Sequence, residues 1–138
     1  MWLVDRQFPA LRWIAAPWNR LGLLVLAIGI GLDAWAAWSF IRERTTISPM
    51  HPSRTNRLVD FGVYRISRNP MYLGLAMSLS GWALLLGSPV CLTLVWVFAR
   101  VLVLVQIAPE EAALREKFGE AYLEYSRHIN RWIGRRIN

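Results

Sequence analysis

The chain has 138 residues, of which 55% are hydrophobic and 18% are charged. A soluble domain of this length normally carries more charge, so the composition favours an integral membrane protein with one domain. The net charge is +7, but the basic residues flank apolar segments, which indicates orientation in a membrane rather than nucleic-acid binding. A lone cysteine, Cys91, excludes an intrachain disulfide and a cysteine metal cluster, and we expect no metal site.

Three apolar segments follow one another along the chain, at about Leu21–Ile41, Met71–Leu86 and Val90–Ala108. A span perpendicular to the membrane needs about 20 apolar residues. The first and third segments are long enough, and the shorter second one ends at an uncharged turn, Gly87-Ser88-Pro89. The pattern therefore predicts an all-α protein with about three transmembrane helices, of which the second and third form a tight hairpin.

Arginine distribution predicts how these segments are oriented. The loop 42–69 and the tail 109–138 are rich in arginine, whereas the hairpin turn is uncharged, so the loop and the tail are expected in the cytosol. The single domain, 1–138, then consists of a non-cytosolic, interfacial start (1–20), a transmembrane helix (21–41), the cytosolic loop (42–69), the transmembrane hairpin (70–108) and the cytosolic tail (109–138). Arg6, Arg12 and Arg20 on the far side are a mild conflict with this rule.

The tail carries the pattern of a single amphipathic helix. Pro109 suits the first turn of that helix, and Glu110 and Glu111 suit its positive N-terminal end. The apolar side chains recur every three or four residues, as expected for one helical stripe: Leu114, Phe118, Tyr122, Tyr125, Ile129 and Trp132.

Two polar clusters border the hairpin. The stretch from Leu58 to Gly74 has an ordinary structural interpretation, with Asn69 as N-cap, Pro70 as first helical residue, Arg68 as interface anchor and two tyrosines as membrane-belt aromatics. The second cluster, 106–111, has adjacent carboxylates that either complement the helix dipole or hold a ligand ammonium. Because both clusters lie at the cytosolic ends of neighbouring helices, we expect one interfacial pocket for a zwitterionic, aromatic-bearing soluble ligand, with a second mouth open to lipid.

These two clusters resemble the motifs of the isoprenylcysteine carboxyl methyltransferase family, whose relatives include the phospholipid methyltransferases. That family has a Leu-Val-x-x-Gly-x-Tyr element followed by Arg-(His or Asn)-Pro-x-Tyr-x-Gly, and a Glu-Glu motif after a membrane hairpin. The matching residues here are Leu58, Val59, Gly62, Tyr64, Arg68, Asn69, Pro70, Met71, Tyr72, Leu73 and Gly74, then Glu110, Glu111, Leu114, Phe118, Gly119, Tyr122 and Tyr125. The resemblance covers about residues 21–133.

The resemblance implies S-adenosylmethionine as cofactor, with S-adenosylhomocysteine as product. Glu110 would face the methionyl ammonium, with Glu111 beside it. The other binding residues carried over from the motifs are Leu58, Val59, Tyr64, Asn69, Pro70, Met71 and Tyr72. It also implies a small multi-pass methyltransferase of the bacterial inner (plasma) membrane, with its active site facing the cytosol.

The chain departs from the family pattern in two places. Members that methylate prenylcysteine carry an arginine four residues before the first glutamate, where this chain has Gln106. Relatives usually have another membrane span before the segment that begins near Leu21, so the start of this chain looks truncated. The first departure weakens the assignment of prenylcysteine itself as the substrate.

The expected activity is methylation of a lipophilic small-molecule or lipid substrate, with carboxyl methylation as first choice. Phospholipid or lipid-amine N-methylation is one alternative, and a non-catalytic membrane subunit with the same framework is another. Methyl transfer from a sulfonium mainly requires alignment and desolvation of the nucleophile, so we name no general base. Arg68 and Gln106 are the residues placed at the reacting group. Asp33 and Arg100 are intramembrane charges of unassigned role, and membrane lipids and self-association complete the expected partners.

Overall fold

The computed structural model describes residue 1, residue 14 and residues 16–42 and 61–135. Its regular elements are helical in these ranges, which confirms the all-α prediction, and the sole β contact among them is an isolated bridge between Ile129 and Arg135. Most of the predicted cytosolic loop lies outside the described residues, including Leu58 and Val59 of the first motif. Its described end forms a short 3-10 helix, Gly62–Arg65.

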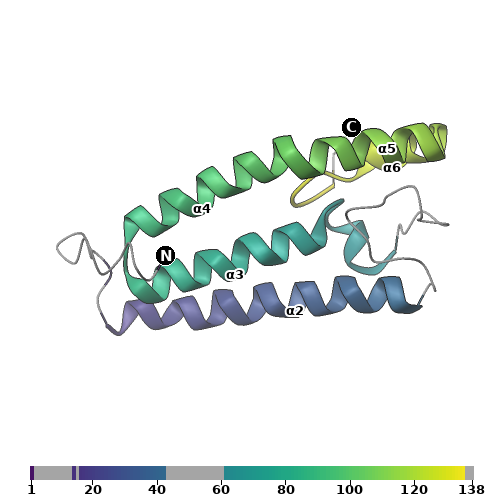
Figure 1. Cartoon of the computed structure of the whole chain (residues 1–138). Helices are drawn as coiled ribbons and strands as arrows, with labels where there is room; N and C mark the ends of the chain where they lie inside the picture. The colour runs from purple at the N-terminus through teal and green to yellow at the C-terminus, as the bar shows by residue number, and fades with distance from the viewer. Residues whose placement is uncertain (2–13, 15, 43–60, 136–138) are drawn as a thin grey trace.

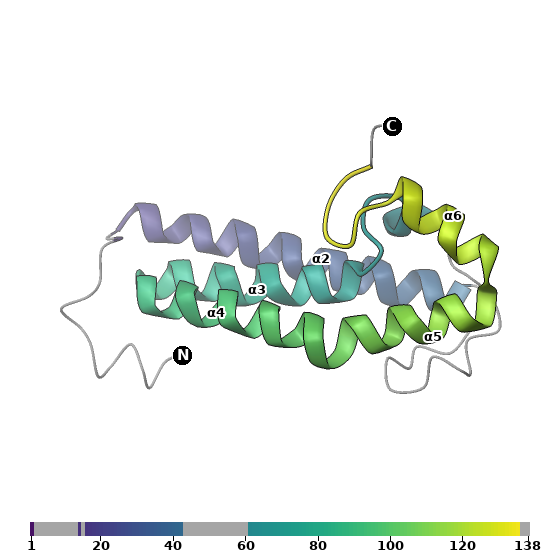
Figure 2. The same cartoon turned by 90° about the horizontal axis from the view of Figure 1, so that it is seen from above.

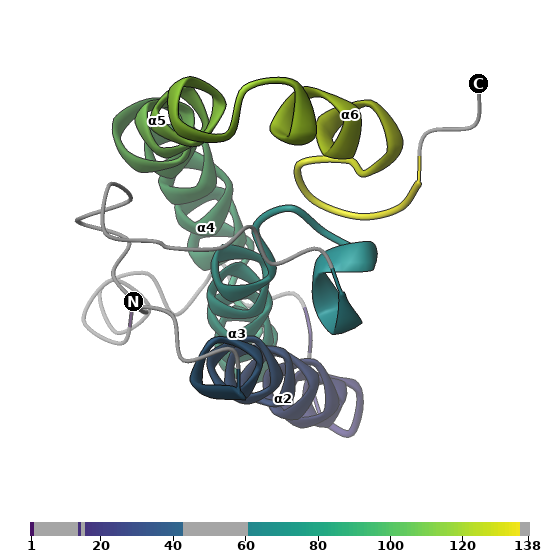
Figure 3. The same ribbon diagram turned by 90° about the vertical axis from the view of Figure 1, so that its right-hand side faces the viewer.

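Helices α2 (Leu21–Arg42) and α3 (Pro70–Leu86) form the closest packed pair, and α3 lies between α2 and α4 (Figures 1 and 3). Two glycine pairs allow the backbones of α2 and α3 to approach each other closely. A Cβ on Gly29 would lie 2.6 Å from the carbonyl oxygen of Gly74, and one on Gly81 would lie 2.6 Å from that of Gly22. Since a side chain at these positions would collide with backbone, the glycines set the separation of the two helices.

The turn between α3 and α4 (Pro89–Leu102) is the predicted tight hairpin turn. Gly87 ends α3 in the left-handed conformation, with φ 68°. Ser88 caps the next helix, since its Oγ accepts a hydrogen bond from the Cys91 amide at 3.4 Å, and Pro89 occupies the first turn. Cys91 is buried and acts as a small apolar side chain in the packing of this turn.

The helix after this turn does not stop at the predicted membrane boundary. It continues through a π-helical segment, Val103–Ile107, into α5 (Ala108–Phe118), so Pro109 lies in the first turn of α5 as predicted, but α5 is continuous with the helix before it rather than separate from it. Proline cannot donate a backbone hydrogen bond, and its ring collides with the carbonyl four residues earlier in a regular α-helix. The wider π turn just before Pro109 is the kind of irregularity that accommodates such a residue.

The predicted tail helix is also broken. Gly119 adopts φ 54° and ψ −125°, a conformation available essentially to glycine, and α6 (Glu120–His128) turns back from α5 (Figure 2). Ile129 is extended, and the chain then forms a loop closed by the Ile129–Arg135 bridge. Trp132 therefore lies in a loop rather than on the predicted helical stripe.

Two helices in the described residues are long and apolar enough to cross a membrane, Trp18–Ser39 and Pro89–Phe118. The second has 30 residues, about 45 Å at 1.5 Å per residue, which exceeds an apolar core of about 30 Å. We therefore take α5 to extend beyond the apolar layer. Both helices leave large apolar side chains exposed, as lipid-facing surfaces require: Leu23, Leu24, Ile28, Ile30, Trp38, Trp96, Val101, Leu104 and Val105.

Candidate functional site

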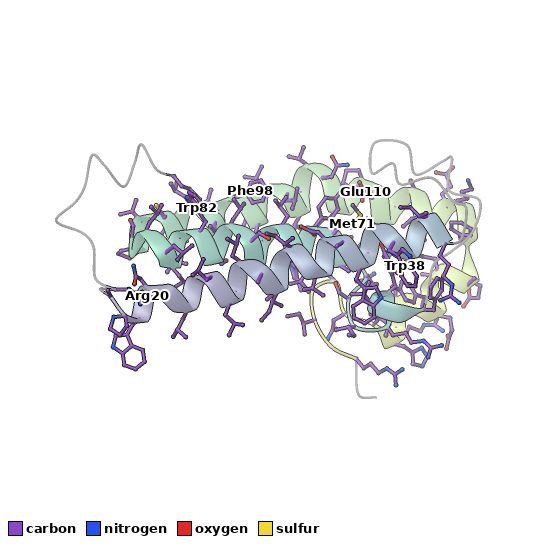
Figure 4. All side chains as sticks on the ribbon, turned by 90° about the horizontal axis from the view of Figure 1, so that it is seen from below. Arg20, Trp38, Met71, Trp82, Phe98 and Glu110 are labelled. Carbon is purple, nitrogen blue, oxygen red and sulfur yellow. The ribbon has the colours of Figure 1, made fainter. Side chains whose placement is uncertain are left out.

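The first turn of α3 and the start of α5 lie at the same end of the helix bundle. Figure 4 shows Met71 and Glu110 toward the end marked by Trp38, far from Arg20 and Trp82 at the other end. The two polar clusters of the sequence are thus brought together, as predicted. Hydrogen bonds join them directly, from Tyr72 to Glu110 and from Asn69 to Glu111.

Glu110 is held by uncharged donors. The Tyr72 hydroxyl and the Gln106 side-chain amide each donate to Glu110 Oε1 at 2.6 Å. Gln106 reaches Glu110 from one helical turn before it, across the end of the π-helical segment. Burial raises the pKa of Glu110 above its usual value, and the two hydrogen bonds oppose that rise because they favour the ionised carboxylate.

Glu111 has cationic partners instead. The Arg131 guanidinium forms a bidentate pair of hydrogen bonds with the Glu111 carboxylate, from Nε to Oε1 at 3.0 Å and from Nη2 to Oε2 at 2.7 Å. Arg68 Nη1 lies 3.5 Å from the same Oε1, and the Asn69 amide donates to it at 3.4 Å. Burial alone would raise the pKa of Glu111, but the bonds from Arg131 and the charge of Arg68 outweigh burial and hold that pKa below its usual value.

Arg68 and Asn69 do not have the local roles that their neighbourhood in the sequence indicated. The Asn69 side chain makes no N-cap hydrogen bond, and its amide instead donates to Glu111 and to the carbonyl of Arg131 at 3.3 Å. Arg68 is not an interface anchor, because its side chain is only 11% exposed and its Nη1 also donates to the Tyr122 hydroxyl at 3.4 Å. Pro70, by contrast, occupies the predicted first turn of α3 and is buried.

Aromatic side chains support the cluster from the 3-10 helix and from α6. The Tyr125 hydroxyl donates to the Tyr64 carbonyl at 2.7 Å, and Tyr64 is buried in an apolar cluster against which Met71 packs. Tyr122 is buried next to Glu111 and Arg68, and burial raises the pKa of its phenol. Tyr64 and Tyr122 thus brace the site from inside. Of the two tyrosines predicted as belt aromatics, Tyr64 is buried and Tyr72 donates to Glu110.

A C-terminal loop completes the cluster. Arg131, which no motif in the sequence marks, lies in this loop 20 residues after Glu111. The loop also accepts backbone bonds from the first motif, since the Arg68 amide donates to the Asn130 carbonyl at 3.1 Å. Sequence reasoning missed Arg131 because nothing around it differs from an ordinary basic tail.

Two other suspected residues lie apart from these contacts. Asp33 packs against Gly74 in the α2–α3 interface, and its buried Oδ1 has no hydrogen-bond partner among the described residues. Arg100 lies over the ring of Trp96 on the exposed side of α4, with 5.8 Å between its guanidinium carbon and the ring centroid. No contact that joins either residue to Glu110 or Glu111 is seen in the part of the chain that the structure describes.

The model of the phospholipid methyltransferase family matches residues 18–121, which include α2, α3, α4 and the Glu110–Glu111 pair. The chain belongs to this family. Its phospholipid methyltransferase region thus contains both polar clusters joined by hydrogen bonds, whereas Arg131 lies outside it. This confirms the family resemblance read from the motifs.

Similar proteins come from bacteria, plants and mammals. Protein-S-isoprenylcysteine O-methyltransferase B of Arabidopsis thaliana is 29% identical over 129 residues, which cover 88% of this chain and 61% of the plant protein. The mouse protein-S-isoprenylcysteine O-methyltransferase is 30% identical over 128 residues, 89% of this chain and 42% of its own length. A Haemophilus influenzae protein is 40% identical over 63 residues, 46% of this chain and its own full length. No solved structure matches the chain.

Proposed function

We propose that this chain is an S-adenosylmethionine-dependent methyltransferase that acts on a lipophilic substrate at the cytosolic face of a membrane. The observation that carries the proposal is the arrangement around Glu110. This carboxylate is half-buried, and the donors to it are a hydroxyl and an amide, so its charge is not neutralised by Tyr72 or Gln106. A site of this kind favours a ligand ammonium group.

The residues present fit the proposed cofactor. Glu110 would hold the methionyl ammonium, and the proposed binding set keeps Tyr64, Pro70 and Met71, of which the first two are buried and Met71 is partly buried. When bound, S-adenosylmethionine supplies an already activated methyl group, so the protein mainly has to align the acceptor and exclude water. Leu58 and Val59 remain part of the proposed binding set but lie outside the described residues.

Glu111 is proposed to support this site indirectly, because its carboxylate is already paired with two cations. Arg131 and Arg68 already satisfy its carboxylate, so Glu111 orients Asn69 and Arg68 rather than binding an ammonium itself. Arg68 keeps its proposed place near the acceptor, since its buried Nε makes no hydrogen bond within the described residues. Gln106 is proposed to act near the acceptor through its hydrogen bond to Glu110.

The proposed topology has three membrane-spanning helices. α2 and the continuous helix Pro89–Phe118 are long enough to span, and the 17-residue α3 returns through the same layer because the hairpin turn ties it to α4. The charges favour a cytosolic position for the end with Glu110, because the tail beyond α5 carries Arg127, Arg131 and Arg135. The bacterial inner membrane is the proposed location.

A lipophilic carboxyl group is the first proposed acceptor, in line with the names of the plant and mammalian relatives. A phospholipid amine is the second, in line with the description of the family itself. The product separates the two candidates, because a methyl ester releases its methyl group in mild base and a methylated amine does not. Incubation with a methyl-labelled donor and total membrane lipid, followed by base treatment, makes this test.

Calorimetric titration of the detergent-purified protein with S-adenosylhomocysteine tests the cofactor. We expect saturable binding by the wild type and loss of detectable binding in Glu110→Gln, which keeps the shape of the side chain and removes its charge. Glu116→Gln is the matched control, since Glu116 is an exposed carboxylate on the same helix. A folded wild type that fails to bind would contradict the proposed cofactor, and unchanged binding by Glu110→Gln would remove Glu110 from the site.

A further inference from the structure

The loop Ile129–Arg135, here called the strap, is joined to the first motif by four hydrogen bonds. The Arg68 amide donates to the Asn130 carbonyl at 3.1 Å, and the Gly134 amide donates to the Ile66 carbonyl at 2.8 Å. Two side chains of the motif complete the set, because Ser67 Oγ and Asn69 Nδ2 both donate to the Arg131 carbonyl, at 3.2 and 3.3 Å. The strap therefore fixes the backbone that leads into α3.

The side chain of Arg131 joins the strap to a second element, α5. Its guanidinium forms the two bonds to Glu111 Oε1 and Oε2, at 3.0 and 2.7 Å. Glu111 is 9% exposed and Arg131 is 35% exposed, so the carboxylate is buried beneath a guanidinium that still reaches solvent. One residue thus binds the motif through its carbonyl and α5 through its side chain.

We propose that Arg131 is a positioning residue for the cofactor site. It fixes the position of the Arg68–Asn69 segment relative to the Glu110–Glu111 pair. This inference rests on the proposed function, because the site it positions is the proposed cofactor site. Arg131 does not touch Glu110. It acts through Glu111, whose backbone is continuous with that of Glu110, and through the strap carbonyls that Arg68 and Asn69 engage.

The geometry requires arginine rather than any cation. A planar guanidinium presents two parallel N–H groups that match the two oxygens of a carboxylate, whereas a lysine ammonium binds as a point charge. Arg68 does not replace this contact, because it approaches Glu111 with one nitrogen at 3.5 Å and also donates to Tyr122. Lysine at position 131 would therefore keep the charge and lose the fixed orientation.

The inference predicts a change in pH dependence as well as in affinity. The groups that face Glu111 are Arg131 from the strap, Arg68 and Asn69 from the motif, and Tyr122 from α6. The cations hold the pKa of Glu111 below its usual value, so its ionised form persists as the pH falls. Without Arg131 the carboxyl would take up a proton at higher pH, and binding would fail at higher pH with it.

The test compares S-adenosylhomocysteine affinity across pH in wild type, Arg131→Gln and Arg131→Lys. We expect Arg131→Gln to weaken binding at neutral pH by about tenfold and to move the acidic limit of binding to higher pH. Arg131→Lys should restore the acidic limit, because the charge remains, while its affinity stays below that of the wild type. Arg127→Gln is the matched control, since Arg127 is 61% exposed and pairs with α6 carboxylates alone among the described residues.

The outcomes are distinct from those that test the cofactor. A wild type that does not bind contradicts the proposed function itself. A wild type that binds, together with Arg131→Gln and Arg131→Lys variants that bind as tightly and over the same pH range, overturns the role of Arg131 alone. If Arg131→Gln does not fold, Arg131→Lys decides: weaker binding than Arg127→Gln supports the inference, and equal binding overturns it.

Discussion

Glu110 and Glu111 are neighbours in the chain but have partners of opposite kinds. Glu110 meets a hydroxyl and an amide, whereas Glu111 meets two guanidinium groups. The sequence predicted a carboxylate pair next to the first motif, and the structure confirms that placement. It did not predict the division of roles, because Arg131 lies in a loop whose path depends on the break at Gly119 and on long-range backbone bonds.

The Asn69 side chain shows the same limit of local reasoning. Asparagine before proline at a helix start is a sound N-cap pattern, and Pro70 does take the first turn. The amide nevertheless bonds to Glu111 and to the Arg131 carbonyl, 42 and 62 residues away in the chain. A local pattern names the backbone position correctly, but distant partners decide where the side chain points.

The Tyr72 hydroxyl offers a test at the scale of one atom. In Tyr72→Phe, Glu110 loses a hydrogen bond of 2.6 Å that favours its ionised form. The pKa of Glu110 is already raised, so the variant should raise it further and move the acidic limit of S-adenosylhomocysteine binding to higher pH. Affinity at neutral pH should fall by about tenfold, the loss of about one hydrogen bond to a charged group.

Titration of wild type and Tyr72→Phe at several pH values checks this expectation. A control comes from Ser126→Ala, which removes a hydroxyl bonded to a backbone carbonyl within α6, at Leu123. An acidic limit that stays in place in Tyr72→Phe would mean that Glu110 does not govern binding. A shift of equal size in the control would trace the effect to general loss of structure.

At the scale of elements, the glycines of α2 differ in what surrounds them. Helix α2 contains Gly22, Gly29 and Gly31, and the sequence alone does not say which of them face another helix. A Cβ at Gly29 would meet the backbone of Gly74 and Ser78, with 2.6 Å to each, whereas a Cβ at Gly31 meets nothing within 4 Å. Gly29→Ala should therefore destabilise the fold by about 1–3 kcal/mol, as overpacking does.

Gly31→Ala is the matched control for that prediction. It adds the same methyl group to the same helix at an open position, where alanine is favoured over glycine by about 1 kcal/mol in helix propensity. Thermal unfolding of both variants in one detergent, followed by circular dichroism, makes the comparison. Equal midpoints would show that the α2–α3 contact is looser than the structure has it.

The break between α5 and α6 is the second test at this scale. Gly119 has φ 54° and ψ −125°, where any other residue is strained by about 1–3 kcal/mol. The hydrophobic stripe of the tail continues across this position, so periodicity alone predicted one helix through Trp132. Gly119→Ala should favour that straight helix, draw the strap away from Ile66 and Arg68, and weaken S-adenosylhomocysteine binding.

Limited proteolysis alongside the titration checks the Gly119 prediction. The expected result is faster tryptic cleavage in the strap, at Arg131 or Arg135, together with weaker binding. Leu123→Ala on α6 is the control for a change in the tail that leaves Gly119 intact, because Leu123 is only partly buried. Unchanged cleavage and unchanged affinity in Gly119→Ala would show that the backbone conformation at this glycine does not hold the strap in place.

For the whole molecule, charge and apolar surface together favour one orientation. Arg127, Arg131 and Arg135 follow α5 in the chain, in α6 and the strap. The opposite end of the bundle holds the uncharged hairpin turn and the Trp18–Arg20 turn (Figures 1 and 4). The sole cysteine, Cys91, has no exposed surface, so the wild type should resist thiol reagents. Single cysteines placed at the two ends can therefore report which side of the membrane each end faces.

Trp18→Cys and Arg127→Cys are suitable reporters because the native side chains are 71% and 61% exposed. With a membrane-impermeant maleimide, Trp18→Cys should be labelled in intact spheroplasts, and Arg127→Cys only after the membrane is opened. The positive-inside rule is the physical reason for this expectation, since segments rich in Lys and Arg next to membrane spans are generally retained in the cytosol. Labelling of Arg127→Cys in intact spheroplasts would place Glu110 and its partners outside the cell. A site there would have no access to a cytosolic methyl donor, and the proposed function would fail with the topology.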